Sequence, residues 1–245
     1  MLKENEQIDD LQIKGLKIIQ NKNKFRFGTD AVLLSYYAKI KPGGRCADLG
    51  TGTGIIPLLL SAKSTARQIT GIEIQEDLCD TASRSVELNN LADKIKIFCG
   101  DIRKIADYFK KGEFDNVVSN PPYMKSGSGF RSDDDSIAVS RHELICSISD
   151  IAKAASYLLC DKGMLTMVHR PNRLADVICV LRENCLEPKS IRFVQSFEGK
   201  PPNLFLINAQ KNAMPFLKID KPLIMRNGDG GYTDEIYKIY GMEKE

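Results

Sequence analysis

The sequence predicts an α/β fold built on a doubly wound, mostly parallel sheet of seven strands. From Pro42 onward, short apolar runs that suit buried strands alternate with segments whose apolar residues recur at helical spacing. The last two strand candidates, 191–194 and 204–207, have no helical segment between them, so we expect them to pair antiparallel at a sheet edge. We therefore expect a main domain over residues 41–245, with residues 1–40 forming a small β-hairpin and a helix packed on it.

The composition is that of an ordinary globular chain. Its 245 residues, 42% hydrophobic and 27% charged, are enough for a sizeable core. The seven cysteines are scattered and form no C-x-x-C pair, which argues against disulfides or a zinc site and for a reducing, cytoplasmic location. Residues 1–10 are acidic and polar, unlike a signal peptide, and no apolar run approaches the roughly 20 residues of a membrane helix. We therefore expect no metal and no membrane segment.

The first forty residues are expected to form the hairpin and one helix. Residues 8–20 show short alternation of apolar and polar side chains around Gly15, a pattern typical of two strands joined by a turn. Residues 31–38 are expected to be helical. Thr29 or Asp30 is expected to cap this helix, because both side chains accept hydrogen bonds from unpaired helix N–H groups.

The main domain is expected to alternate strands and helices and to end in a tail. Strands are expected at 46–49, 68–74, 94–99, 114–119, 164–168, 191–194 and 204–207. Helices are expected after the first strand to about residue 62, at 76–90, from 102, over the apolar positions 151–159 and from Pro171. The tail is expected to form a short docking helix with Tyr232, Ile236, Tyr237 and Tyr240.

A glycine-rich turn follows the first strand of the main domain, with Asp48, Gly50, Gly52 and Gly54 at alternate positions. Glycine lets the backbone turn tightly and approach a ligand, and the start of the next helix offers unpaired N–H groups to an anion. The spacing differs from the G-x-G-x-x-G of dinucleotide folds, and no P-loop Lys-Ser/Thr follows. The turn therefore predicts binding of the methionine carboxylate of S-adenosylmethionine (SAM). A plain tight turn and a nicotinamide site are the alternatives.

Acidic residues end the next two strands. Glu73 lies about twenty residues after the glycines, where an acidic side chain meets a ribose diol in related folds, and the alternative is an exposed strand-end carboxylate. Asp101 is placed to accept from an adenine amine, or alternatively to cap the following helix. We expect both residues, with their neighbours Ile74 and Ile102, among the cofactor-binding residues.

Asn120, Pro121, Pro122 and Tyr123 follow the fourth strand. The prolines stop the strand and leave the Asn120 amide at its carboxyl end, where open α/β sheets bind ligands. If the Asn120 oxygen and the Pro121 carbonyl accept both protons of a ring-conjugated amine, its nitrogen can pyramidalise and expose a lone pair, while Tyr123 stacks on the base. We expect these four residues to be catalytic, with Asn120 also binding the cofactor. Adenine N6, cytosine N4 and a glutamine amide all remain possible acceptors.

Two further segments are candidates for ligand contacts. Phe27 and Thr29 precede the main domain, where a segment can close over the cofactor, and the alternative is a loop and helix cap. Arg141 and His142 follow a polar loop and either contact a phosphate or start the next helix. His169 is expected to be a structural residue at a strand end rather than a catalyst.

Basic residues gather near the N-terminus. Between residues 11 and 45 there are eight Lys or Arg residues and a single acidic one, and a second basic stretch covers 211–226. Basic patches bind phosphates without regard to sequence. We expect Lys22, Lys24 and Arg26 to bind RNA together with Arg141 and His142 of the segment above; the alternative is a solvated surface.

The chain resembles the bacterial tRNA1(Val) adenine-37 N6-methyltransferase family over nearly its whole length. The resemblance rests on Phe-Arg-Phe-Gly-Thr-Asp-Ala-Val-Leu-Leu at 25–34, Asp-Leu-Gly-Thr-Gly-Thr-Gly-Ile-Ile-Pro at 48–57, Gly-Ile-Glu-Ile-Gln at 71–75, Asn-Pro-Pro-Tyr at 120–123, Arg-His-Glu at 141–143 and His-Arg-Pro at 169–171. It implies the class I SAM-dependent methyltransferase fold and a SAM cofactor. It also implies that Glu73 and Asp101 hold the cofactor nucleoside, that Asn120 and Tyr123 hold the target base, and that the substrate is an adenine next to a tRNA anticodon.

Three alternatives stand beside that resemblance. Glutamine methyltransferases of release factors share Asn-Pro-Pro-Tyr but carry an N-terminal helical bundle, for which residues 1–24 are too short and too β-like. Methyltransferases of ribosomal RNA bases share the same motifs, and a non-catalytic RNA-binding module would not need them intact. We therefore expect an N6-adenine methyltransferase acting on tRNA, and a monomer rather than an obligate oligomer.

Overall fold

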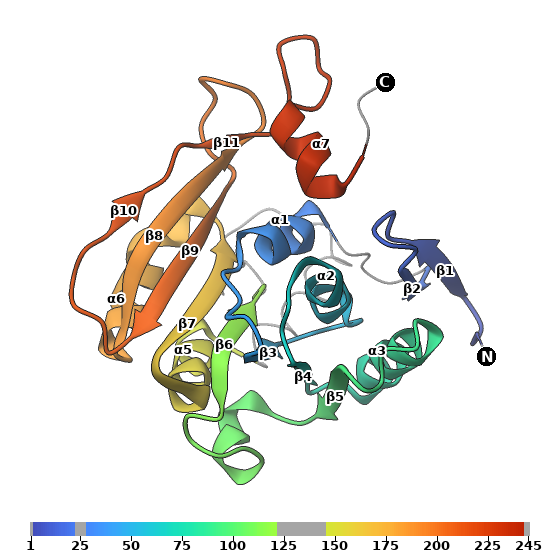
Figure 1. Ribbon diagram of the computed structural model, residues 1–245. Helices are drawn as coiled ribbons and strands as arrows, with labels where there is room; N and C mark the ends of the chain where they lie inside the picture. The colour runs from blue at the N-terminus through green and yellow to red at the C-terminus, as the bar shows by residue number, and fades with distance from the viewer. Residues whose placement is uncertain (1, 23–27, 122–145, 243–245) are drawn as a thin grey trace, which may run out of the picture.

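The structure is a computed structural model that describes residues 2–22, 28–121 and 146–242 (Figure 1). A central sheet carries helices on both faces, and a separate two-stranded hairpin lies beside α3. The carboxyl ends of the five parallel strands β3 to β7 lie at one edge of the central sheet. That edge is where the sequence places the candidate site.

The central sheet contains the seven predicted strands in the order β5-β4-β3-β6-β7-β9-β8. Strands β3 to β7 are parallel to one another, and β9 runs antiparallel to both β7 and β8, as the missing helix between the last two strands predicts. The strands are β3 (Arg45–Leu49), β4 (Gln68–Glu73), β5 (Ile95–Cys99), β6 (Phe114–Ser119), β7 (Leu159–His169), β8 (Leu186–Gln195) and β9 (Leu204–Lys211).

The edge of the sheet differs from the prediction of seven strands. Two short strands, β10 (Lys218–Ile219) and β11 (Leu223–Ile224), pair in parallel with β8, so the described sheet has nine strands. Segments of two residues are too short to show the alternation that identifies a strand. Strands β7 and β8 also begin five residues earlier than expected, because each contains a register shift opposite its neighbour that interrupts the apolar pattern.

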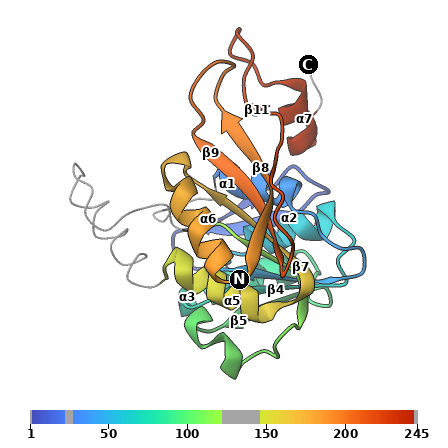
Figure 2. The ribbon, with the colours of Figure 1, turned by 90° about the vertical axis from the view of Figure 1, so that its left-hand side faces the viewer.

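Helices cover the two faces of the sheet in separate groups (Figures 1 and 2). One core cluster joins the sheet to α1, α2 and α3, and the other joins it to the 3₁₀ helix η1, α5 and α6, so the sheet is doubly wound as predicted. The predicted tail helix is α7, which buries Ile236 and Ile239 and contacts α1. The helices are α1 (Thr29–Tyr37), α2 (Ile55–Lys63), α3 (Glu76–Leu88), η1 (Ile102–Asp107), α5 (Ile148–Leu158), η2 (Pro171–Arg173), α6 (Leu174–Glu183) and α7 (Asp234–Tyr240).

The predicted cap of α1 is wrong. Gly28 occupies the N-cap position, and no side chain accepts a hydrogen bond there. Thr29 and Asp30 already lie inside the first turn of the helix, one and two residues too late for a capping side chain to reach back.

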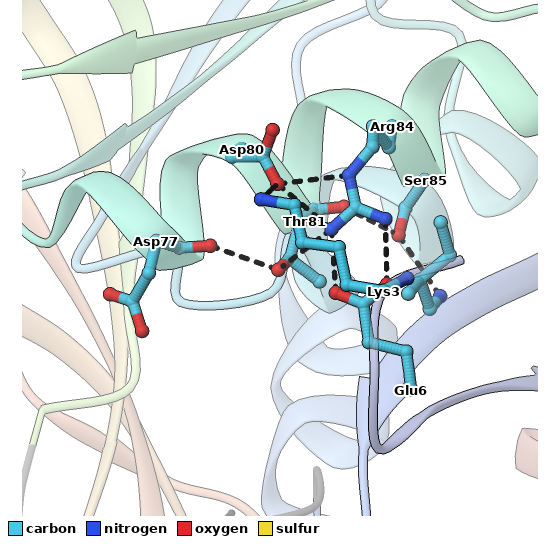
Figure 3. A network of polar contacts seen from close by, with 8 residues as sticks. Lys3, Glu6, Asp77, Asp80, Thr81, Arg84 and Ser85 are labelled. Atoms are coloured by element: carbon cyan, nitrogen blue, oxygen red, sulfur yellow. Dashed lines mark hydrogen bonds and ion pairs between the residues drawn. The ribbon is translucent and has the colours of Figure 1, made fainter. Parts of the chain in front are cut away.

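The N-terminal hairpin consists of β1 (Glu6–Asp10) and β2 (Lys17–Asn21), and side chains fasten it to α3. The Arg84 guanidinium donates to both Glu6 oxygens, at 2.8 and 2.6 Å, and its Nε donates to Asp80 at 2.9 Å (Figure 3). The backbone N–H of Ile19 donates to the Ser85 hydroxyl at 3.0 Å. A two-pronged Arg–carboxylate pair fixes orientation as well as distance, so the hairpin has a defined position on α3.

The division of the chain at residue 40 stays a prediction. Residues of the hairpin and of α1 belong to the same core cluster as α2 and the sheet. In the described part of the chain, no helix is both long and apolar enough to cross a bilayer.

Candidate active site

The glycine-rich turn has the conformation that its glycines predict. Gly50, Gly52 and Gly54 have φ values of +74°, +56° and +83°, a region that is costly for residues with a Cβ. A Cβ on Gly54 would also lie 3.1 Å from the Cβ of Ala82 on α3. Gly54 is the N-cap of α2, and no side chain accepts a hydrogen bond from the first N–H groups of that helix.

Glu73 is buried and holds the turn together. Its Oε2 accepts from the Gly52 N–H at 2.9 Å, and its Oε1 accepts from the N–H groups of Ile74 and Gln75 at 3.0 and 3.1 Å. The alternative of an exposed strand-end carboxylate is therefore wrong, since the residue is 5% exposed. Glu73 thus lies at the glycine turn. Its hydrogen bond to the Gly52 N–H is a contact that sequence patterns do not indicate.

Asp48 is buried beside the turn without a hydrogen bond. Neither carboxyl oxygen forms a hydrogen bond of good geometry, and neither does the neighbouring Thr51 hydroxyl, which lies close enough to influence the Asp48 charge. Burial raises the pKa of Asp48 to about 7, the negative charge of Glu73 adds to the rise, and the Thr51 hydroxyl opposes it. Thr51 lies over Gly71, the residue paired with Asp48 on β4, because only a glycine leaves room for it there. The result is a pair of buried polar groups without partners beside the glycine turn.

Asp101 is the N-cap of η1, which confirms the helix-cap interpretation. Its side chain accepts from the Arg103 N–H at 2.9 Å and forms an ion pair with the Arg103 guanidinium at 2.7 Å. Hydrogen bonding to Arg103 lowers the pKa of Asp101, so this carboxylate is charged at neutral pH. Contact between Asp101 and an adenine amine stays a prediction. Ile102 beside it is buried, and Ile74 is half-buried.

Asn120 follows β6 directly, next to the glycine turn. Ser119, the last residue of β6, is paired with Leu49, the last residue of β3, and its hydroxyl donates to the Leu49 carbonyl at 2.9 Å. Asn120 and Gly50 are therefore the next residues on two neighbouring parallel strands. Pro121 is buried. The fold thus brings the Asn-Pro segment and the glycine turn together, although they lie about seventy residues apart in the chain.

Several predicted site residues lie outside the described part of the chain. These are Lys24, Arg26, Phe27, Pro122, Tyr123, Arg141 and His142. Of the predicted residues near them, Lys22 is exposed and Thr29 is half-buried at the start of α1.

His169 lies at a strand end, as expected, and its structural role stays a prediction. It ends β7, is 1% exposed, and its Nδ1 accepts from the backbone N–H of Arg170 at 2.8 Å. Burial lowers the pKa of His169 to about 4, so the imidazole is neutral at physiological pH. Within residues 2–22, 28–121 and 146–242, no group of three or more His, Cys, Asp or Glu side chains is placed to hold a metal ion.

The comparisons with known proteins agree with this geometry. Residues 11–183 match the family model of the methyltransferase small domain. The fold is similar to that of a protein described as a predicted O-methyltransferase from Agrobacterium tumefaciens, with a TM-score of 0.72 and 23% identity over 87% of this chain and 96% of that one. The chain therefore belongs to the methyltransferase small domain family, and it is a methyltransferase.

The curated relatives identify the group within that family. The chain is 30% identical to a tRNA1(Val) (adenine(37)-N6)-methyltransferase of Porphyromonas gingivalis, over 94% of this chain and 93% of that protein. It is 29% identical to the protein of the same name from Parabacteroides distasonis, over 84% and 85% of the two chains. The chain belongs to the family of these relatives.

Proposed function

We propose that this chain transfers a methyl group from SAM to the exocyclic N6 of an adenine in tRNA. The observation that carries the proposal is the place of Asn120, directly after β6 and beside Gly50 at the turn that precedes α2. An amide acceptor for an NH2 group thus stands next to the turn proposed to hold the methyl donor. The names of the curated relatives supply adenine 37 of a valine tRNA as the target.

The residues present fit a SAM cofactor. The uncapped N-terminus of α2 suits its carboxylate, since helix N-termini attract anions. Asp48 is a buried carboxyl without a partner, and a cationic α-ammonium group would remove the cost of burying its charge. Glu73 and Asp101, with Ile74 and Ile102, are proposed to hold the ribose and the adenine. Thr29 and Phe27 are proposed to complete the site from the N-terminal side.

The chemistry needs a reactive methyl group and an amine with an exposed lone pair. When bound, SAM supplies a methyl group on a positively charged sulfur, which is already a strong electrophile. The Asn120 oxygen and the Pro121 carbonyl accept hydrogen bonds from the two N–H groups of the adenine amine. The nitrogen then becomes pyramidal, and its lone pair points at the methyl group. Tyr123 is proposed to stack on the base and hold it in line, and Pro122 to be the further catalytic residue of the motif. After transfer, the nitrogen loses one proton to solvent and becomes neutral.

The substrate is proposed to be tRNA rather than a release factor. The N-terminal segment is a β-hairpin fastened to α3, which leaves no N-terminal helical bundle among residues 2–22. Lys22, Lys24, Arg26, Arg141 and His142 are proposed to contact RNA phosphates. Affinity for tRNA should then fall steeply as salt increases, because each phosphate contact releases counterions. The proposal also includes a cytoplasmic monomer that needs no metal.

Replacing Asn120 tests the proposal. Asn120→Ala removes one of the two acceptors, so methyl transfer to tRNA should fall by at least about a hundredfold, the loss typical of one transition-state hydrogen-bond partner. Equilibrium binding of S-adenosylhomocysteine should change little. Mass spectrometry of nucleosides from the treated tRNA measures the product, N6-methyladenosine.

The same assay with release factor as substrate decides between the two classes of acceptor. Methylation of release factor, with none of tRNA, would overturn the proposed substrate. Loss of cofactor binding together with turnover in Asn120→Ala would mean that Asn120 is structural.

A further inference from the structure

Gln20 is a buried polar residue without a hydrogen-bond partner. It is the fourth residue of β2, its exposed fraction is 1%, and neither its amide oxygen nor its amide nitrogen is paired. Buried amides are almost always hydrogen-bonded, because an unpaired one loses its bonds to water and gains nothing. Gln7, which is paired with Gln20 in the hairpin, does have a partner, since its Nε2 donates to Asp9 at 2.6 Å.

The side chain of Gln20 lies on the core-facing side of the hairpin. Side chains alternate along a strand, so Gln20 lies on the face of Ile18 and opposite to Ile19. Ile18 packs in the core cluster that contains Ile55 and Ile56 of α2. Ile19 instead lines a surface depression with Arg84 and Leu88 of α3.

Gln20 also lies near the start of α2 rather than its end. The hairpin turn sits at the end of this helix, where Lys14 Nζ donates to the Ala62 carbonyl at 2.7 Å. From there β2 runs along α3, and the Ile19 N–H reaches Ser85, one turn after Ala82. Ala82 is the residue that a Cβ on Gly54 would touch, and Gly54 is the N-cap of α2. The next residue along β2 is Gln20, which brings its amide to the level of the glycine-rich turn.

Two other buried groups without partners lie at the same end of α2. Asp48 and Thr51 flank the glycine turn, and Asp48 shares a sheet face with Cys46, which belongs to the cluster that holds Ile18. Two separate segments, β2 and the glycine turn after β3, thus each carry buried polar atoms without a hydrogen-bond partner on the α2 side of the sheet. A ligand that both donates and accepts hydrogen bonds would suit such a set of groups.

We infer that Gln20 is a cofactor-binding residue that contacts the amino-acid end of SAM. The inference rests on the proposed use of SAM. The amide nitrogen of Gln20 donates to the carboxylate or its oxygen accepts from the α-ammonium group, while Asp48 balances the positive charge. The Arg84–Glu6 pair holds the hairpin on α3 and so sets the position of Gln20. The N-terminal hairpin is then part of the cofactor-binding site.

Calorimetric titration with two ligands tests this inference on the full chain. Gln20→Met keeps the length of the side chain and removes both polar atoms, so S-adenosylhomocysteine should bind about 10- to 100-fold more weakly. Methylthioadenosine lacks the amino-acid end, so the same variant should bind it as the wild type does. The thermal midpoint of the ligand-free variant should be unchanged or higher, because a buried unpaired amide has been removed. Gln7→Met, in the same hairpin, is the matched control and should leave S-adenosylhomocysteine binding unchanged.

Each other outcome has a distinct meaning. Equal affinity of wild type and Gln20→Met for S-adenosylhomocysteine would overturn the role of Gln20 and leave the proposed methyl transfer intact. Equal weakening for both ligands, or a lower thermal midpoint with weaker binding, would make Gln20 a structural residue. A wild-type chain that binds neither ligand would overturn the proposed cofactor, and the role of Gln20 with it.

Discussion

Asp48 and Glu73 lie at or next to the ends of two neighbouring parallel strands, at the same edge of the sheet, but only one of the two carboxyl groups is hydrogen-bonded. Glu73 accepts hydrogen bonds from the backbone N–H groups of Gly52, Ile74 and Gln75. Asp48 is more deeply buried, and neither of its oxygens has a partner. A carboxylate held by backbone donors is part of the scaffold, whereas one left without a partner is costly unless a ligand supplies it. The contrast supports Asp48 as the acidic group that meets the cofactor's ammonium.

The difference arises from what surrounds each side chain. Glu73 is the last residue of β4, where the chain turns and exposes several N–H groups that no strand uses. Asp48 lies inside β3, where the neighbouring backbone N–H groups belong to the pairing with β4 and β6. Its paired residue on β4 is Gly71, which has no side chain to reach it. Position within the strand therefore decides which carboxylate is bonded.

Removing the bonded carboxylate should have the largest effect. Glu73→Ala leaves three backbone N–H groups without their acceptor, so the free energy of unfolding should fall by about 3–5 kcal/mol. Binding of S-adenosylhomocysteine should weaken as well, since the Gly52 N–H loses its anchor. Urea unfolding of the ligand-free protein, followed by circular dichroism, measures the loss.

Glu76→Ala is the control for that loss, because Glu76 is an exposed acidic residue three positions later. It should cost less than about 1 kcal/mol. A loss in Glu73→Ala no larger than in this control would mean that the turn does not depend on Glu73.

Neutralising the unpaired carboxylate should have a smaller effect of opposite sign. The pKa of Asp48 is raised to about 7 from its usual value near 4, so the folded chain holds this proton more tightly than the unfolded chain. Stability of the ligand-free protein should therefore fall as pH rises from 4 to 7, by at most about 4 kcal/mol, and then level off. Asp48→Asn should remove this fall and raise stability at pH 8 by about 1–3 kcal/mol. Urea unfolding from pH 4 to pH 8 measures both.

The difference between wild type and Asp48→Asn isolates this carboxyl. His169, whose pKa is lowered to about 4, adds stability as pH rises through the same range, and its contribution cancels in the difference. Asp107→Asn, at an exposed site, should give no such difference. If Asp48→Asn and the wild type show the same pH dependence, Asp48 is not buried as a costly charge. Saturating SAM should flatten the wild-type curve, because the ammonium group would then pair with Asp48.

The neighbour of Asp48 should give the smallest effect. Thr51→Val keeps the shape of the side chain and removes a buried hydroxyl without a partner, so stability should change by less than about 1 kcal/mol. The hydroxyl lowers the pKa of Asp48, so its removal should move the upper end of the pH-dependent fall to higher pH. Thr53→Val, in the same turn, is the control and should leave that end in place. If the pH dependence of stability is the same in Thr51→Val as in the wild type, the Thr51 hydroxyl does not affect the pKa of Asp48.

Much of the fold can be predicted from local patterns in the sequence. The seven strands, their order of alternation with helices and the tail helix follow from apolar runs and from spacing. Errors occur where the pattern is short or interrupted. Strands β10 and β11 have two residues each, and Lys162, with a φ of +57°, interrupts β7 near its start. The predicted cap of α1, Thr29 or Asp30, lies one or two residues after the true N-cap Gly28, because glycine is also acceptable at that position and sequence alone does not choose.

The same division holds for the candidate site. The helix cap formed by Asp101 involves only residues next to it in the chain, so it could be predicted from the sequence. Gln20 was not recognised as a candidate. The available signal was a polar residue two positions after Ile18 on an otherwise apolar strand face, and it had no meaning until the partner of that face was known.

The glycine turn, the acidic residues near the strand ends and the Asn-Pro-Pro-Tyr motif could be read from the sequence alone, because they depend on backbone freedom and on neighbours a few residues away. Tertiary structure decided which buried polar groups have partners. One Glu73 oxygen accepts from a loop twenty-one residues earlier in the chain, whereas the segments packed around Asp48 and Gln20 supply no hydrogen-bond partner. Hydrogen-bond satisfaction is a property of the packed chain, since each donor and acceptor is supplied by whichever segment the fold brings near.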